Sequence, residues 1–140
     1  MMSANGARYD IRQLRAGYGH YLDRGDWEAW ANLFAPDATV EFGSYRHLED
    51  RDEIREFGES VVDDLFEFSM HTAQMPLIEV DDDTATGHWY LLVYYELSDG
   101  DPGWIYGTYD DEYRRVDDEW KFSYVTNEVA VDTGGMADRR

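Results

Sequence analysis

The sequence predicts an α+β domain in which a curled, mostly antiparallel β-sheet packs on N-terminal helices and encloses a pocket. Two observations lead to this prediction. Up to residue 65, apolar residues recur mostly at helical spacing, whereas four long strand-like segments fill most of the remaining chain. The length of 140 residues and the hydrophobic content of 43% are those of one globular domain, which we place at residues 1–140.

The first helix is predicted over residues 8–22, because one stripe of apolar side chains recurs there at helical spacing. The stripe consists of Ile11, Leu14, Tyr18, Tyr21 and Leu22. The arginines of this segment, Arg8, Arg12 and Arg15, are expected largely on the other sides of the helix. Gly17 and Gly19 weaken the helix but favour a close approach by another part of the backbone.

A second, short helix is predicted directly after the first. Gly25 suits the C-terminal cap of the first helix, and Asp26 suits the N-cap of the second. The apolar residues of this second helix are Trp27, Trp30, Leu33 and Phe34. Pro36 and Asp37 are expected to end it.

A hairpin and a third helix are predicted next. Residues 38–42 and 45–48 read as short strands around a turn at residues 43–44. Asp50 followed by Glu53 forms a capping-box pattern, which opens a helix. The apolar positions of that helix are Ile54, Phe57, Val61, Val62 and Leu65.

The remainder of the chain is predicted to be all strand. The four segments cover approximately residues 67–80, 84–97, 104–116 and 119–131. Aspartates, glycines and a proline, which favour turns, separate them at residues 81–83, 98–103 and 117–118.

The charge of the chain excludes two classes of partner. The formal net charge is −19, from 31 acidic and 12 basic residues. Such a negative field opposes the binding of nucleic acids and of anionic membrane surfaces. Two explanations for the acidic surface stay open: adaptation to a high-salt cytoplasm, or the ordinary acidity of a mesophilic protein. The absence of cysteine excludes disulfides and thiol chemistry.

No cofactor is expected. The histidines, His20, His47, His71 and His88, lack the spacing of a metal site. No glycine-rich phosphate loop follows any predicted strand. The polar N-terminus and the lack of a long apolar segment favour a cytoplasmic protein.

His71 is the most informative residue, because it lies in an otherwise apolar, strand-like run. An imidazole in such a setting needs a partner, either to satisfy its N–H group or to tune it as a base. Asp23, at the end of the first helix, is the candidate partner. The alternative is that His71 is a hydrogen-bonded residue of the pocket wall without a chemical role.

Several local strings, in this order, resemble the SnoaL-like branch of the nuclear transport factor two-like superfamily. They are residues 21–27, 33–38, 78–85, 107–113 and 120–122. The resemblance implies a cone-shaped α+β barrel with a deep pocket. It is nearest to the group of scytalone dehydratase, bile-acid dehydratase and hexachlorocyclohexane dehydrochlorinase.

The resemblance also implies roles for four residues. His71 matches the histidine base of that group, and Asp23 matches the aspartate that orients it. Tyr18 is similar to the tyrosine of the dehydratases, where the dehydrochlorinase carries a lysine. Asn127 lies where relatives carry an arginine or an asparagine. If an arginine at this position is essential for stabilising charge, its replacement by Asn127 narrows the range of reactions that the site can catalyse.

The strand at residues 88–96 alternates between two sets of side chains. The first set is His88, Tyr90, Leu92, Tyr94 and Glu96, and the second is Trp89, Leu91, Val93 and Tyr95. We place Tyr94 in the pocket as a ligand contact, whereas for His88 and Glu96 a position facing solvent or a subunit neighbour is an equal alternative. Tyr109 is also predicted to line the cavity. Trp89 and Tyr95 indicate either an oligomer interface or an additional core layer.

We therefore expect a cofactor-independent lyase, most simply a dehydratase, that acts on a small, largely apolar cyclic, polyketide- or steroid-like molecule. His71 serves as base, Asp23 as its orienting group, Tyr18 as acid or polarising group, and Asn127 as a substrate anchor. We expect a homo-oligomer, either a dimer or a trimer. An isomerase or polyketide cyclase with the same pair, and a non-catalytic binding domain, stay open as alternatives.

Overall fold

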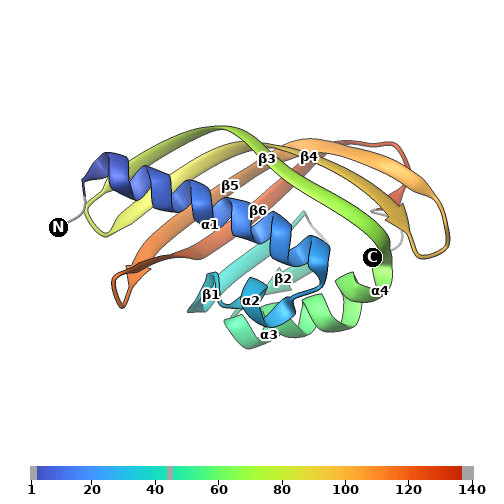
Figure 1. Cartoon of the computed structure of the whole chain (residues 1–140), viewed down its shortest axis with the longest axis horizontal. Helices are drawn as coiled ribbons and strands as arrows, with labels where there is room; N and C mark the ends of the chain where they lie inside the picture. The colour runs from blue at the N-terminus through green and yellow to red at the C-terminus, as the bar shows by residue number, and fades with distance from the viewer. Residues whose placement is uncertain (1–2, 44–45, 137–140) are drawn as a thin grey trace.

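The structure is a computed structural model that describes residues 3–43 and 46–136. One long helix, α1, lies against a curved sheet, and the smaller elements gather beside its C-terminal half (Figure 1). The helices are α1 (Ala4–Arg24), α2 (Trp27–Ala31), α3 (Arg51–Phe57), the π-helical η1 (Gly58–Val62) and α4 (Asp63–Leu65). The strands are β1 (Phe34–Phe42), β2 (Arg46–Leu48), β3 (Phe66–Asp81), β4 (Thr84–Leu97), β5 (Pro102–Val116) and β6 (Glu119–Asp132).

The strands form a single mixed sheet in the order β2-β1-β6-β5-β4-β3. β1 runs parallel to β6, and every other pair is antiparallel. The sheet curls around α1, whose apolar stripe packs into a core rich in aromatic rings. At the centre of this core lie Tyr18, Trp30, Phe34, Tyr109 and Phe122. The predicted α+β class is confirmed.

The ends of the first two helices follow from their capping residues. Ser3 caps α1, because its hydroxyl oxygen accepts a hydrogen bond from the Gly6 amide. Gly25 ends α1 at φ 70°, a left-handed conformation that suits glycine. The Asp26 side chain then accepts a hydrogen bond from the Ala29 amide at 3.2 Å and caps α2 as predicted.

The predicted end of the second helix is wrong. Phe34 and Pro36 belong to β1, which pairs with the distant strand β6, so that tertiary pairing overrides the local helical pattern. The pairing register shifts between Phe34 and Thr39. Pro36 falls in this irregular stretch, where the regular hydrogen bonding between β1 and β6 is interrupted. The missing N–H group of proline therefore removes no regular hydrogen bond between the two strands. β1 and β2 form the predicted hairpin, but Ser44 and Tyr45 lie outside the described residues.

The third helix begins as predicted, with the Asp50 side chain accepting a hydrogen bond from the Glu53 amide at 2.8 Å. The Glu53 carboxylate accepts from the Glu49 amide rather than from that of Asp50, so the capping box is shifted by one residue. At Gly58 the helix widens into η1, and a Cβ there would lie 2.5 Å from the Trp27 ring. Glycine therefore lets this helix pack closely on α2.

The four long strands match their predicted ranges within two residues. Aspartates close two of the turns in the left-handed region: Asp82 at φ 53°, Asp117 at φ 51° and Asp118 at φ 66°. Within the described ranges, no helix combines the length and the apolar character that a bilayer crossing needs.

Candidate functional site

The candidate site begins where the end of α1 meets β3. Gly19 allows this contact, because a Cβ at that position would lie only 2.7 Å from the His71 carbonyl oxygen. The helix backbone can therefore approach the strand closely, one turn before Asp23. The close packing predicted from the glycines of α1 is present at Gly19.

Asp23 and His71 are joined as the sequence predicts. The His71 ring nitrogen Nδ1 lies 2.7 Å from Asp23 Oδ1. Asp23 Oδ2 accepts a second hydrogen bond from the His71 amide at 2.9 Å, and the Ser69 hydroxyl donates to Asp23 Oδ1 at 2.9 Å. These bonds fix the carboxylate against the strand. Because a carboxylate accepts hydrogen bonds, this contact favours the tautomer of His71 with a proton on Nδ1, in which Nε2 can accept one.

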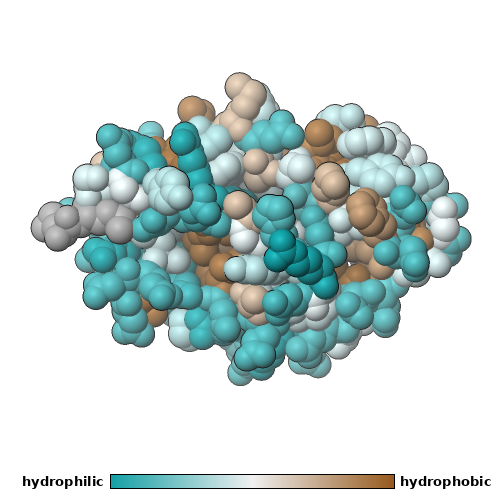
Figure 2. Space-filling model, viewed as in Figure 1, coloured by the Kyte–Doolittle hydropathy of each residue, from teal (hydrophilic) through white to brown (hydrophobic). Residues whose placement is uncertain are grey.

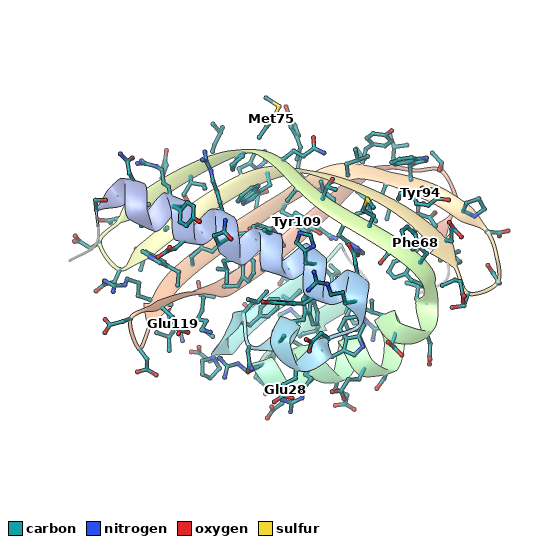
Figure 3. The ribbon with its side chains drawn as sticks, in the orientation of Figure 1. Glu28, Phe68, Met75, Tyr94, Tyr109 and Glu119 are labelled. Carbon is teal, nitrogen blue, oxygen red and sulfur yellow. The ribbon has the colours of Figure 1, made fainter. Side chains whose placement is uncertain are left out.

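His71 lies in the wall of a cavity between α1, the short helices and the inner face of the sheet. Three other predicted site residues, Tyr18, Tyr109 and Asn127, also line it, and Asp23 stands behind His71. Figure 3 shows Tyr109 near the middle of the molecule, close to α1. The rest of the wall is apolar. It includes Leu22, Trp30, Phe42, Phe57, Val62, Leu65, Phe66, Leu91, Val93, Ile105, Val129 and Met136.

The cavity is small, with a volume of about 50 Å³. Pockets that bind drug-sized ligands measure roughly 300–1,000 Å³. The present space therefore suits a few water molecules, and a ring-shaped ligand has to displace side chains of the apolar wall.

Asn127 presents an amide group to the cavity from β6. Its Oδ1 atom accepts a hydrogen bond from the Gly43 amide at 3.1 Å. This bond occupies the oxygen and leaves the NH₂ group as a donor toward the cavity.

Tyr18 and Tyr109 form the wall on the side of α1 and β5. Their rings meet edge to face, with centroids 5.7 Å apart. Burial raises the pKa of Tyr18 well above 10. Burial likewise raises the pKa of Tyr109 to about 12, against the opposing effect of Arg15. Both phenols are therefore protonated at neutral pH and act as hydrogen-bond donors.

Tyr94 does not reach the cavity, so its prediction as a ligand contact is wrong. The alternation along β4 is as predicted, but Trp89 and Tyr95 belong to the set on the buried, inner face of the sheet. Period-two spacing separates two sets without saying which one is inner. The composition of the two sets indicates which one is inner. The set with Trp89 and Tyr95 is entirely apolar and aromatic, whereas the set with Tyr94 also contains His88 and Glu96.

The alternatives for Trp89 and Tyr95 are also resolved. Both are buried in the core of a single chain, with relative exposures of 4% and 0%. They form the additional core layer, and the exposed aromatic residue of β4, Tyr90, belongs to the other set.

Arg15 is the residue that sequence reasoning missed. It is buried rather than on an outer side of α1, and its Nη2 atom pairs with Asp111 Oδ1 at 2.9 Å. The Tyr113 hydroxyl donates to Asp111 Oδ2 at 2.6 Å, and Trp89 Nε1 donates to the Tyr113 oxygen at 2.9 Å. Arg15 comes four residues after Ile11 and three before Tyr18, so helical spacing alone places it on the apolar stripe.

Burial also changes the acidity of this pair. It raises the pKa of Asp111 to about 6, although Arg15 and the Tyr113 hydrogen bond oppose the shift. The Asp111 carboxylate thus exchanges its proton in a range where an exposed aspartate is fully ionised. Across residues 3–43 and 46–136, no cluster of three or more acidic or histidine side chains is arranged to hold a metal ion.

The fold and the site define an α+β protein with a curled sheet, a helix-covered cavity and a His–Asp pair in its wall. The family model described as the SnoaL-like domain matches residues 6–126. The chain therefore belongs to the SnoaL-like domain family, and the resemblance predicted from its sequence is confirmed. No curated protein matches the chain.

Solved structures share this fold. A candidate aromatic ring hydroxylase from Novosphingobium aromaticivorans is 22% identical, with a TM-score of 0.90 over 99% of this chain and 100% of the other. A candidate scytalone dehydratase from the same species is 23% identical, with a TM-score of 0.85 over 91% and 87%. A hexachlorocyclohexane dehydrochlorinase from Novosphingobium barchaimii is 21% identical, with a TM-score of 0.84 over 91% and 88%. At these identities, the similarity shows the fold.

Proposed function

We propose that the protein is a cofactor-independent lyase that eliminates water from a small, largely apolar cyclic, polyketide- or steroid-like molecule. The observation that carries this proposal is the hydrogen bond of 2.7 Å between His71 Nδ1 and Asp23, at the wall of an apolar cavity. The names of two structural neighbours, a candidate dehydratase and a dehydrochlorinase, support an elimination.

In this proposal, His71 Nε2 takes a proton from a carbon next to a carbonyl group. Asp23 stabilises the imidazolium that forms. The electrons of the C–H bond form a C=C bond while the neighbouring C–O bond breaks. Tyr18 protonates the departing oxygen, which leaves as water, and the proton held by His71 returns to Tyr18 through solvent. Asn127 and Tyr109 hydrogen-bond the carbonyl oxygen as it gains negative charge.

The test uses the bicyclic β-hydroxy ketone 3-hydroxy-1-tetralone, whose loss of water yields 1-naphthol. We expect the wild-type protein to accelerate the formation of naphthol, followed by its absorbance. If the probe binds, as measured by calorimetry, but is recovered unchanged, the elimination is overturned and a non-catalytic binding domain is the result.

We further propose that the protein is a homo-oligomer assembled through the outer face of the sheet. Here the outward-facing large hydrophobic side chains of four adjacent strands meet; we name them the outer patch. It comprises the exposed residues Phe68, Met70, Tyr90, Trp104, Tyr106 and Val131 and the half-buried Tyr94. Apolar residues gather over β3 and β4 in Figure 2, and Phe68 and Tyr94 point outward there in Figure 3.

A second copy of the chain is the occupant that the charges favour. The chain carries a net charge of −19, so most approaches between two copies are repulsive. No member of the outer patch is charged at neutral pH. The rings of Tyr94 and Trp104 already contact each other, with centroids 5.1 Å apart. The outer patch is thus an uncharged surface on which two copies can meet.

A further inference from the structure

Arg15 is a charged side chain in the interior of the protein. Its side chain and that of its partner Asp111 have relative exposures of 1% and 0%. The pair joins the middle of α1 to the inner face of β5, directly beside the cavity wall.

The guanidinium lies against the rings that line the cavity. Arg15 Cζ is 3.4 Å from the centroid of the Tyr109 ring and 4.3 Å from that of Tyr18. A cation over an aromatic face is attracted by the ring electrons and withdraws electron density from the ring. The two phenol rings of the cavity wall therefore lie in direct contact with a buried positive charge.

The stability of the fold does not account for this arrangement. Arg15 Nε and Nη1 have no hydrogen-bond partner among the residues that the structure describes. Burying unpaired donors and a charged pair costs free energy, and apolar replacements of such pairs are often neutral or stabilising. A costly charge beside a cavity points to a role in the chemistry of that cavity.

We propose that Arg15 is a positioning residue that polarises the hydroxyl groups of Tyr18 and Tyr109 toward the two substrate oxygens on which negative charge develops, the departing oxygen and the carbonyl oxygen respectively. The inference rests on the elimination proposed above. It places the cation of the site on α1, against the ring of Tyr109, which is the cross-strand partner of the uncharged Asn127. Arg15 itself does not reach the substrate and acts through the two rings.

The electrostatics of the site agree with this role. Arg15 lowers the pKa of Tyr109 and of Tyr18, against burial, which raises both. Tyr109 and, to a smaller extent, Asp111 raise the pKa of Tyr18, whereas Asp111 and Asp23 raise that of Tyr109. For Tyr109 the effect of Arg15 is larger than that of Asp111. Arg15 and Asp111 together therefore make the Tyr109 hydroxyl a stronger hydrogen-bond donor.

The test removes both charges at once, in the double variant Arg15→Met/Asp111→Leu, because a single removal leaves one buried charge without its partner. On 3-hydroxy-1-tetralone, we expect kcat to fall about 10-fold to 100-fold, with KM and the melting temperature nearly unchanged. Arg15→Lys, which keeps the charge, should retain more activity than the double variant. The matched control is Arg12→Met, an exposed arginine of the same helix. An unchanged kcat in a folded double variant overturns the proposal.

A second readout does not depend on turnover. Tyrosine labelled with carbon-13 at Cζ reports the ionisation of Tyr109 by NMR, with Tyr109→Phe to assign its signal. We expect the double variant to begin this titration at a higher pH than the wild type. An identical titration overturns the role of Arg15, even if the wild type proves inactive and the elimination itself fails.

Discussion

Among the described residues, two His–Asp pairs flank the sheet, one on each face, and their difference shows what makes such a pair chemically useful. On the inner face, His71 Nδ1 meets Asp23 at 2.7 Å, and on the outer face His88 Nδ1 meets Asp110 at 2.5 Å. The inner side chains are 12% and 19% exposed, whereas the outer ones are 49% and 61% exposed. The two pairs share their chemistry and differ in their surroundings.

The surroundings decide what each imidazole can do. The aspartate of the inner pair also accepts hydrogen bonds from the His71 amide and the Ser69 hydroxyl, which fix its orientation. Its histidine faces an apolar cavity with phenol and amide donors. The outer pair lies in solvent, where water competes for every hydrogen bond. We therefore expect chemistry from the inner pair alone.

The largest effect is expected from His71→Ala, which removes the base. Turnover of 3-hydroxy-1-tetralone should fall about 10²-fold to 10⁴-fold, while the melting temperature stays nearly unchanged, since this side chain lies in a cavity wall. The matched control is His88→Ala, which should retain full activity. Full activity in His71→Ala, or equal losses in both variants, contradicts the distinction between the two pairs.

A loss of similar origin is expected from Asp23→Asn. The amide can donate to Nδ1, which favours the wrong tautomer of His71, so kcat should fall on the order of 10²-fold or more. Asp110→Asn is the control on the outer face and should leave kcat unchanged. Steady-state kinetics of the two variants check this prediction. A wild-type kcat in a folded Asp23→Asn protein shows that the carboxylate does not orient the base.

A smaller loss is expected when the helix is pushed away from β3. In Gly19→Ala, the new Cβ would lie 2.7 Å from the His71 carbonyl oxygen, so α1 or the strand has to move. We expect the His71–Asp23 distance to change and kcat to fall about 10-fold to 100-fold. Gly17→Ala is the control, because its Cβ meets only side-chain atoms of Tyr21 and Leu33 at 3.3–3.5 Å. If both variants keep kcat, the close approach at Gly19 does not position the pair.

The dependence of stability on pH tests the buried pair beside the cavity. Because the pKa of Asp111 is raised from 3.8 to about 6 in the folded protein, the native state binds more protons than the unfolded state between these values. Relative to the Arg15→Met/Asp111→Leu variant, the wild type should therefore lose stability as the pH rises from 4 to 6, on the order of 1–3 kcal/mol. Denaturant unfolding across this range measures the difference. If the difference in unfolding free energy between the wild type and this variant is constant from pH 4 to pH 6, the pKa of Asp111 is not raised in the folded protein.

The smallest effect on activity is expected from the outer patch. Trp104→Glu places a charge in its centre and should dissociate the oligomer, as measured by light scattering, through like-charge repulsion between copies. The kcat of the variant should stay near that of the wild type, because Trp104 lies on the opposite face of the sheet from the cavity. A wild-type protein that is monomeric at high concentration contradicts the proposed assembly.

Much of this molecule follows from local patterns. Gly25 and Asp26 mark the junction of α1 and α2, and the aspartates of the turns delimit the strands, because caps and turns depend on adjacent residues. The placement of Tyr18, His71 and Asn127 around one cavity came from the resemblance to a family, whereas that of Tyr109 came from the alternation of faces along its strand. The chemical roles of these residues stay predictions.

The wrong predictions share a physical cause: each of these positions is determined by residues that are distant in the sequence. Pro36 lies in a strand because β6 pairs with β1. Tyr94 faces outward because the core lies on the other side of β4, which alternation alone does not specify. Arg15 is buried because Asp111, 96 residues later, supplies its counter-charge.

The most direct measurement is the exchange of hydrogen for deuterium at C2 of 1-tetralone, a probe that has the acidic carbon but no leaving group. In deuterium oxide, NMR should show faster exchange with the wild-type protein and with His88→Ala than in buffer, and exchange at the buffer rate with His71→Ala. Exchange at the buffer rate with the wild type, or undiminished exchange with His71→Ala, would contradict proton abstraction by the inner pair.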